Sequence, residues 1–285
     1  MRDNSIYYVN HNGERFTLHG DGLCYMDPTP LRAFSWNYQI VNYLGGLGGE
    51  AYGFGRGVRS VQATVRMRGF SPAEFASQMN RFLAVADADN IAGKPGRLYI
   101  GNQYLRCYLA VAGEIDNNTR FSNFAHREIT ILAVNPYWIT EVTTVFNIKT
   151  DDTEDRTGKK FDLKYPYRYG TGLAGGHLIN THYAECPAII TVYGPASAPS
   201  IIIGGNAYSV DVTLTQSQRL VIDQTTREIY TATESGGKVN AFDKRDKTNN
   251  IFAPIPMGDS QVIYDGSFKF SITLIQQRSE PKWES

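Results

Sequence analysis

Short segments of β-type sequence, separated by turns rich in Gly, Asn, Asp and Pro, recur along most of this chain and constrain its fold more than any other feature. Val58 to Phe70 is the clearest case, because apolar and polar residues alternate along it. The apolar positions are Val61, Ala63, Val65 and Met67, and the polar ones are Gln62, Thr64, Arg66 and Arg68. Successive side chains of a strand point to opposite faces, so this alternation predicts a half-buried strand. Many such strands are typical of β-sandwiches and β-barrels.

One segment carries clear helix signals. Ser71 suits the N-cap, Pro72 the first helical position, and Glu74 the reciprocal bond of a capping box. The apolar residues that follow have helical spacing: Phe75, Met79, Phe82, Leu83 and Ala86. We therefore predict one helix that ends at Asp87 to Asn90 and packs its apolar stripe on a sheet.

The strands after this helix favour a β-rich unit in the first half of the chain. Leu98 to Ile100 and Tyr104 to Val111 flank a Gly101–Asn102 turn and predict a hairpin. Ile129 to Val134 predicts a further strand. We expect the unit to close near Asn135–Pro136.

Length and pattern together predict two domains. At 285 residues the chain exceeds the roughly 100 to 200 residues of a typical domain. The strand pattern lapses between Thr140 and Gly176. Short strands then recur at Ala188 to Tyr193, Ser200 to Ile203, Tyr208 to Leu214, Leu220 to Ile222, Glu228 to Thr233, Gln261 to Tyr264 and Phe268 to Ile275. We predict a mainly β chain with an N-terminal sandwich or split barrel with one helix at 1–138, and a second all-β domain at 139–285.

The stretch from Tyr193 to Leu214 illustrates the second domain. Gly204 and Gly205 precede Asn206, and glycine adopts the positive φ that a tight hairpin turn needs. The apolar residues after the turn alternate with polar ones: Tyr208, Val210, Val212 and Leu214. This pattern predicts one continuous strand in a sandwich, with no chemical role.

Composition and charge exclude several classes of protein. Lys plus Arg and Asp plus Glu each total 28, and this zero net charge argues against a specific nucleic-acid partner. No apolar run approaches the roughly 20 residues of a membrane span, and MRDNSIYYVN lacks the features of a secretion signal. We expect a soluble chain with no membrane partner. Cys24, Cys107 and Cys186 show no C-x-x-C pair and favour buried thiols.

No motif predicts a cofactor or a catalytic site. The glycine-rich run from Leu44 to Gly57 contains a formal G-x-G-x-x-A match, but its further glycines disfavour the helix that a dinucleotide site requires. We expect it to be a flexible loop that a partner orders. Asp151 to Asp155 departs from a calcium loop at Arg156 and Asp162, and the histidines lack metal-ligand spacing. We predict neither an enzyme nor a metal site.

Two groups of residues are candidates for an interface. The only local basic cluster consists of Arg56, Arg59, Arg66 and Arg68. These arginines form a solvated strand face or, in a ring of many copies, line a lumen that faces negative charge. Tyr165 and Tyr167 belong to a second group, the run from Tyr165 to Tyr169, and tyrosine suits both sugar stacking and a buried interface.

A series of short motifs runs through the second half of the chain. They are Asn135-Pro136-Tyr137-Trp138, Phe161-Asp162-Leu163, Tyr165 to Tyr169, Tyr193-Gly194-Pro195 with Pro199, Asn240-Ala241-Phe242, Phe252 to Gly258, Tyr264 to Phe268 and Gln277 to Trp283. In order and spacing they resemble the distal tail protein family of long-tailed, non-contractile phages, the siphophages. Before about Ala133 the resemblance rests on the order of the elements.

The resemblance implies a ring of six copies at the tip of the phage tail. An N-terminal belt domain would surround a central channel, and a C-terminal galectin-like β-sandwich would lie outside it. One ring face would bind the tail tube protein and the other the tail-associated hub or fibre protein, with tape measure and receptor-binding proteins as further partners. The chain would be a structural component of the virion, assembled in the host cytoplasm.

A carbohydrate-binding module for host cell-surface glycans is the alternative. Galectin-like sandwiches often bind sugars, and the tyrosine run offers stacking faces. However, no strand carries the His, Asn, Arg and Trp set of a galectin-type site. Saturable glycan binding that is lost in Tyr167→Ala would favour this alternative, whereas turnover of peptidoglycan would favour a third class, a cell-wall hydrolase.

Overall fold

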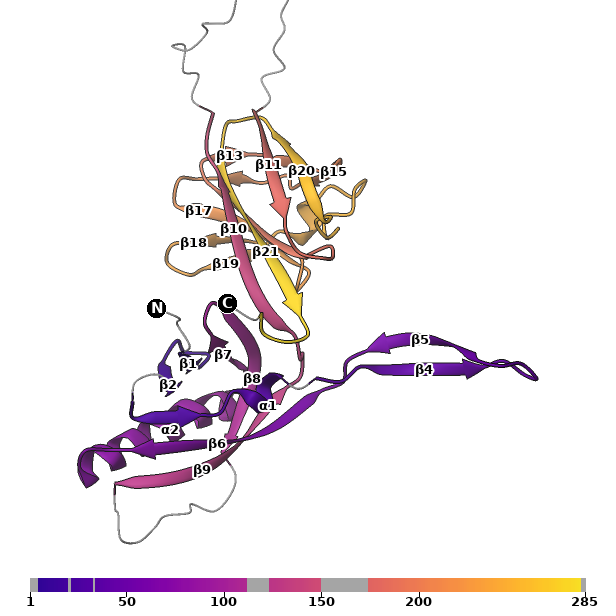
Figure 1. Ribbon diagram of the computed structural model, residues 1–285. Helices are drawn as coiled ribbons and strands as arrows, with labels where there is room; N and C mark the ends of the chain where they lie inside the picture. The colour runs from indigo at the N-terminus through magenta and orange to yellow at the C-terminus, as the bar shows by residue number, and fades with distance from the viewer. Residues whose placement is uncertain (1–4, 20–21, 33, 112–122, 150–173, 283–285) are drawn as a thin grey trace, which may run out of the picture. The chain divides into compact units, whose positions relative to one another are not determined.

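The computed structural model describes residues 5–19, 22–32, 34–111, 123–149 and 174–282, and Figure 1 shows its ribbon. The chain forms two compact units. Unit 1 contains Met1–Thr140 together with Gln277–Ser285, and unit 2 contains Glu141–Gln276. Both units are built mainly from antiparallel strands, which confirms the predicted all-β, two-domain fold class. The C-terminal segment therefore belongs to unit 1, whereas the predicted second domain includes it.

The described residues of unit 1 form strands and two helices. Its elements are β1 (Ile6–Val9), β2 (Arg15–His19), β3 (Cys24–Met26), α1 (Thr29–Arg32), β4 (Asn37–Asn42), β5 (Gly49–Gly55), β6 (Arg59–Arg68), α2 (Pro72–Ala92), β7 (Gly96–Ile100), β8 (Gln103–Val111), β9 (Phe124–Ala133) and the start of β10 (Trp138–Phe146). The strand order is β2-β1-β7-β8, and β8 continues through β9 to β6 and β3. Among the described residues, the strands β4 and β5 pair only with each other.

The predicted strand and hairpin of unit 1 are confirmed. Strand β6 pairs with β9 over its full length, and its inward residues Ala63, Val65 and Met67 are buried. Strands β7 and β8 pair antiparallel across the predicted turn, from Gly96 opposite Cys107 to Ile100 opposite Gln103.

The helix prediction is right at its start and wrong at its end. The Ser71 hydroxyl accepts a hydrogen bond from the Glu74 backbone N–H at 3.2 Å, as an N-cap does. The helix α2 continues to Ala92, because a left-handed residue, Gly93, is what closes it. The short helix α1 was not predicted, since four residues carry no periodic signal.

A buried carboxylate joins α2 to the sheet of unit 1. Asp89 accepts hydrogen bonds from the Tyr8 hydroxyl and from the backbone N–H of His11. Both Tyr8 and Asp89 are fully buried. Burial raises the pKa of Tyr8 above its usual value, so its hydroxyl keeps the proton that it donates.

The described part of unit 2 consists of two larger sheets that share an apolar core and a small two-stranded sheet, β13-β16. Besides the end of β10, its elements are β11 (Ala174–Asn180), β12 (Ala188–Tyr193), β13 (Ala196–Ser197), β14 (Ser200–Ile203), β15 (Asn206–Ser209), β16 (Thr213–Leu214), β17 (Gln218–Asp223), β18 (Glu228–Thr233), β19 (Lys238–Asn240), the 3-10 helix η1 (Phe242–Lys244), β20 (Gly258–Tyr264) and most of β21 (Lys269–Arg278). One sheet has the order β19-β18-β17-β12-β21, and the other has the order β11-β20-β14-β15. Residues from both sheets form one buried cluster, which includes Ile190, Ile201, Tyr208 and Phe270.

The predicted continuous strand from Tyr208 to Leu214 is wrong. Strand β15 ends at Ser209 and pairs with β14, whereas β16 begins at Thr213 and pairs with β13. The apolar positions Tyr208, Val210, Val212 and Leu214 are all buried. The period-2 pattern therefore predicted burial correctly, but it does not record that the chain changes its pairing partner. The turn is as predicted, because Gly204 and Gly205 have φ of 55° and 88°.

Candidate assembly interface

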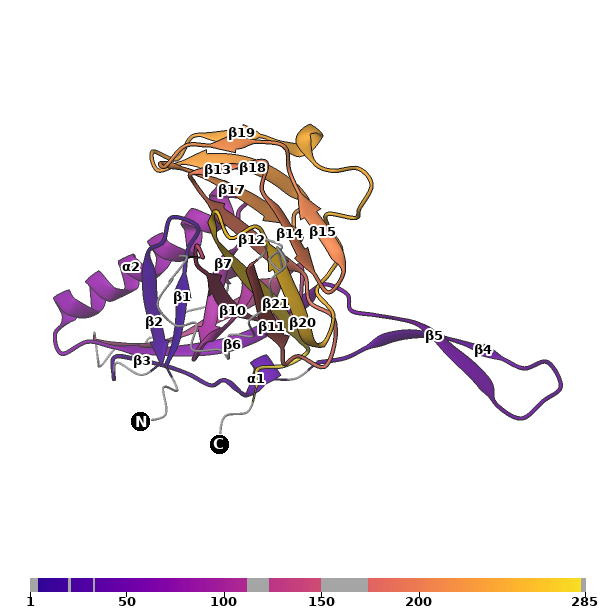
Figure 2. The same cartoon turned by 90° about the horizontal axis from the view of Figure 1, so that it is seen from above.

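The most unusual part of unit 1 is a two-stranded hairpin, residues 37–55, which we call the arm. Strands β4 and β5 pair antiparallel, with Ile40 opposite Ala51 and Asn42 opposite Gly49. Every residue of β4 is exposed, and so is every residue of β5 before Gly55. Figures 1 and 2 both show the arm leaving the other strands of unit 1 as a separate ribbon. The prediction of a flexible loop at residues 44–57 is therefore wrong, because this run forms the arm's tip and second strand.

The arm is apolar as well as exposed. Its large exposed hydrophobic residues are Tyr38, Ile40, Val41, Tyr43, Leu44, Leu47, Tyr52 and Phe54. Leu44 and Leu47 at the tip have relative exposures of 106% and 104%, so they contact almost nothing. The only charged residue of the arm is Glu50. A large number of exposed apolar side chains on one element is typical of an interaction site.

Arg56 anchors the base of the arm. Its guanidinium donates hydrogen bonds to the carbonyl oxygens of Pro136 at 2.9 Å and Ser279 at 3.2 Å. Its central carbon lies 5.0, 5.2 and 5.3 Å from the ring centroids of Phe34, Trp36 and Tyr137. These distances are within the range of cation–π contacts. Arg56 therefore contacts the residues just before β4, the residues just before β10 and the C-terminal segment of unit 1.

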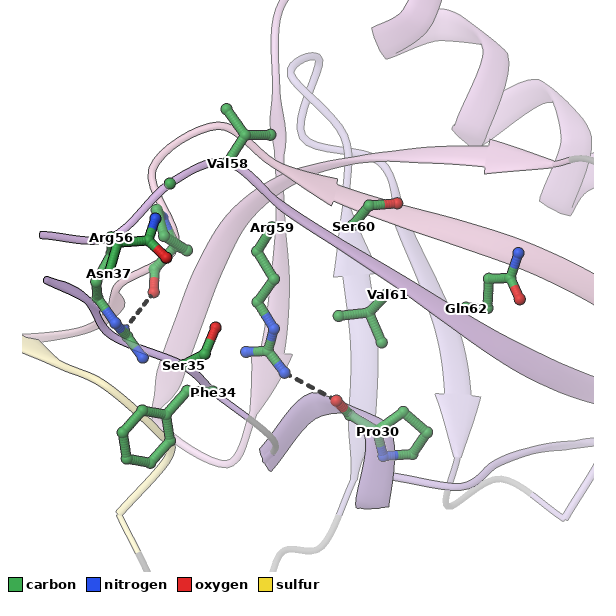
Figure 3. A pocket seen from close by; sticks show the side chains of 12 residues that line it. Pro30, Phe34, Ser35, Asn37, Arg56, Val58, Arg59, Ser60, Val61 and Gln62 are labelled. Atoms are coloured by element: carbon green, nitrogen blue, oxygen red, sulfur yellow. Dashed lines mark hydrogen bonds between the residues drawn. The ribbon is translucent and has the colours of Figure 1, made fainter.

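Arg59 lies beside Arg56 on a cavity of about 620 Å³ (Figure 3). One Nη atom of Arg59 donates to the Pro30 carbonyl at 2.8 Å, and the other is buried without a hydrogen-bond partner among the described residues. Burial lowers the pKa of Arg59, and the nearby charge of Arg56 lowers it further. An unpaired donor in a cationic cavity disfavours any positively charged group there.

Arg66 and Arg68 lie at the other end of β6. The Arg68 Nε donates to the Gly22 carbonyl at 2.7 Å, and the Arg66 guanidinium lies 5.8 Å from the ring centroid of Tyr25. Arg59 and Arg66 are seven positions apart, which is roughly 23 Å of extended strand. The four arginines thus form two separate pairs, one at the base of the arm and one at the far end of the strand.

A pocket of about 500 Å³ adjoins the second pair of arginines. Leu23, Tyr25, Met67 and Phe124 give it apolar walls, and Arg66 and Arg68 also line it. It is formed by the end of β6 and its two neighbouring strands, β3 and β9. We call it the β6-end pocket.

Tyr165 and Tyr167 lie outside the described residues, and so does the acidic run at Asp151 to Asp155. Sequence reasoning missed the arm, although the alternation of Tyr52 and Phe54 among small residues is a strand signal within the glycine-rich run. It had no means of finding the contacts of Arg56, because their partners are up to 223 positions away along the chain.

The described part of the chain contains neither a cluster of metal ligands nor a membrane-spanning helix. Within it, no three His, Cys, Asp or Glu side chains are grouped as metal ligands. The same residues include no helix that is both long and apolar enough to cross a bilayer. The thiols of Cys24, Cys107 and Cys186 are free and buried, as predicted.

Comparison with known proteins identifies the fold. No model of a protein family matches the sequence, and no curated protein is significantly similar to it. Among solved structures, the Dit protein of phage SPP1, described as a paradigm of the hub adsorption apparatus in phages that infect Gram-positive hosts, is similar with a TM-score of 0.58 and 9% identity. That alignment covers 96% of this chain and 98% of the SPP1 protein.

The phage P2 baseplate provides two further matches. A chain of the activated baseplate with Ca has a TM-score of 0.64 and 15% identity, and one of the activated baseplate with Sr has 0.61 and 14%. Each alignment covers 97% of this chain and 99% of the other. Over almost its whole length, this chain therefore has the fold of proteins of the phage hub and baseplate.

Proposed function

We propose that this protein is a structural subunit of a phage tail tip, a distal tail protein. In this proposal six copies form a ring that joins the tail tube to the tail-associated hub or fibre protein and to the receptor-binding apparatus. The observation that carries the proposal is the similarity to hub and baseplate proteins along 96–97% of the chain. The protein would be located at the distal end of the tail in the virion, after assembly in the host cytoplasm.

The arm supports an assembly role on independent physical grounds. An isolated two-stranded hairpin is marginally stable in water, and this one pairs with no other strand of the described residues. Its apolar residues are exposed, whereas assembly with another molecule would bury them. In a ring each copy uses two different surfaces, and a projecting arm can supply one of them.

The proposed role is structural and not catalytic. The proteins of similar fold are a hub protein and baseplate components. The interface that we propose includes both pairs of arginines, Arg56 with Arg59 and Arg66 with Arg68. The predicted contributions of Tyr165 and Tyr167, to an interface or to sugar binding, stay predictions.

Native mass spectrometry of the purified full chain tests the proposal. We expect a species of six copies, and we expect negative-stain images to show closed rings. A variant in which residues 37–55 are replaced by a short Gly-Ser turn should remain folded and lose this species. If the wild-type chain stays monomeric at high concentration, both alone and mixed with the tail tube and hub proteins of its phage, the proposal is wrong.

A glycan array with the full chain separates the sugar-binding alternative from the structural role. Saturable binding that is lost in Tyr167→Ala would favour the alternative. Antibody labelling of virions gives a complementary readout, since a structural subunit should be labelled at the tail tip.

A further inference from the structure

We infer that the cavity beside Arg56 and Arg59 is a binding site for a small organic oxyanion, which carries a phosphate or a carboxylate group. We call it the arm-base cavity. All the residues that line it belong to unit 1, so one chain supplies the whole lining. The inference goes beyond the proposed assembly role and does not depend on it.

The guanidinium of Arg59 has a donor that no protein group satisfies. One Nη donates to the Pro30 carbonyl at 2.8 Å, whereas the other is buried and has no partner among the described residues. In Figure 3 this second Nη points away from Pro30, toward the side of the cavity where Ser35 lies. A buried donor without a partner destabilises the folded chain, and most such groups in native proteins bind a protein group, a water or an ion. A small rotation of the Arg59 side chain turns this donor to a group bound in the cavity.

The lining of the arm-base cavity is cationic. Twelve residues line it, of which Arg56 and Arg59 are charged and none is Asp or Glu. Burial lowers the pKa of Arg59, and the nearby charge of Arg56 lowers it further. A bound anion relieves the repulsion between the two guanidinium groups and accepts charge-assisted hydrogen bonds from them. The charge of the cavity therefore favours an oxyanion over a neutral or cationic ligand.

Other polar groups of the lining can complete the hydrogen bonding of an oxyanion. Ser35 and Ser60 contribute hydroxyl groups, and Asn37 contributes an amide. A Cβ at Gly57 would lie 3.3 Å from the Asn37 Nδ2, so this amide already packs closely against the backbone of the cavity wall. Phosphate and carboxylate groups each have several lone pairs and can accept from more than one of these donors.

Size and apolar walls favour an organic anion over a bare ion. The volume of about 620 Å³ lies within the range of roughly 300 to 1,000 Å³ for pockets that bind small molecules. Phe34, Val58 and Val61 supply apolar surface beside the polar groups. The cavity thus has room for a small organic molecule whose charged end lies at Arg59.

Isothermal titration calorimetry of the full chain tests the site. Phenyl phosphate and benzoate are the probes, and sodium chloride keeps the ionic strength constant. We expect saturable binding of one probe molecule per chain, and the probe that binds more tightly identifies the preferred anionic group. Arg59→Gln should raise the Kd on the order of 10- to 100-fold, because it removes charge-assisted hydrogen bonds. Arg81→Gln is the matched control, since Arg81 also donates one Nη to a backbone carbonyl, that of Arg15 at 2.8 Å, but does not line the cavity.

Ser35→Asp tests the site without removing either arginine. Its carboxylate would lie beside Arg59 and take the place of the bound anion. This variant should therefore unfold at a higher temperature than the wild type and bind neither probe, and it carries the test if Arg59→Gln does not fold. Hydrogen exchange gives an independent readout, because the bound probe should slow exchange at the backbone amides of Ser35 and Asn37 in the wild type.

The outcomes separate this inference from the proposed function. Saturable binding that Arg59→Gln weakens and Arg81→Gln leaves unchanged supports the site. It is overturned if neither probe binds saturably, if the wild type and both variants have the same Kd, or if Ser35→Asp binds as the wild type does. None of these results concerns the ring of six copies, which native mass spectrometry measures separately, so the proposed function would stand. A wild-type chain that binds a probe at Arg59 but forms no ring overturns the proposed function alone.

Discussion

The arm and the β14–β15 hairpin are built from similar local sequence but have opposite environments. Both are antiparallel pairs closed by glycines of positive φ, which are Gly45 and Gly48 in the arm and Gly204 and Gly205 in unit 2. In the β14–β15 hairpin the inward residues Ile201, Ile203 and Tyr208 are each 1% exposed. In the arm every strand residue before Gly55 is exposed.

The difference lies in what each hairpin pairs with and covers. Strand β14 pairs with β20 as well as β15, so one face of the hairpin covers the core of unit 2. Strands β4 and β5 pair with no third strand in the part of the chain that the structure describes. The two hairpins therefore have similar turns but different roles. The β14–β15 hairpin contributes to the core of unit 2, whereas the arm exposes apolar surface that a partner can cover. This comparison predicts that matched substitutions in the two hairpins have different consequences.

The largest expected effect comes from the core of the packed hairpin. Ile203→Ala removes buried methyl groups beside Val262 and should destabilise unit 2 by about 2 to 5 kcal/mol. Urea unfolding followed by circular dichroism measures the change. Ile202→Ala is the matched control, because that side chain is 37% exposed and should cost clearly less. Equal losses for the two variants would contradict the burial of this hairpin.

The next effect concerns the base of the arm. Arg56→Ala removes the hydrogen bonds to Pro136 and Ser279 and the contacts with three rings, and should cost about 1 to 3 kcal/mol. Thermal unfolding reports the loss. Hydrogen exchange should also become faster at the backbone amides beside Trp36.

Arg56→Lys sharpens this prediction. Lysine keeps the positive charge but lacks the planar fork that reaches both carbonyl oxygens, so it should recover only part of the stability. Full recovery by lysine would show that charge alone holds the arm.

The sequence predicted those parts of the fold that depend on local chemistry. Ser71, Pro72 and Glu74 located the start of α2, because a helix cap involves only neighbouring residues. The alternation along β6 gave its buried face correctly, since that pattern follows from strand geometry. Where the chain changes partners, as between β15 and β16, local pattern carried no information.

The candidate site was less predictable for the same reason. The four arginines of β6 and its approach are close in sequence, and the structure divides them because a strand separates residues by about 3.3 Å each. Glycine in the run from Leu44 to Gly57 suggested flexibility, but cross-strand pairing overrides that preference. Helix and strand signals in the sequence thus predict local structure. Closeness in the sequence, by contrast, does not show that charged residues act together.

A third test compares glycines at the two turns. Gly205 and Gly48 have φ of 88° and 99°, and a Cβ at either position would meet nothing within 4 Å. Alanine therefore introduces the same backbone strain at both, about 1 to 2 kcal/mol. Gly205→Ala should lower the free energy of unfolding of unit 2 by this amount. Gly48→Ala should leave global unfolding unchanged, because the tip can open without disturbing a core. A global loss in Gly48→Ala would indicate that the tip packs within its own chain.

The smallest expected effect on the monomer is also the most informative about the arm. Ile40 is 57% exposed, so Ile40→Ala should change the free energy of unfolding by less than about 0.5 kcal/mol. The chemical change is the same as in Ile203→Ala, and only the environment differs. If the proposed ring buries the arm, Ile40→Ala should raise the protein concentration needed for half-assembly, whereas Ile202→Ala should leave that concentration unchanged. Sedimentation velocity across a dilution series measures both variants, and an Ile40→Ala ring with wild-type affinity would show that this strand stays in contact with water after assembly.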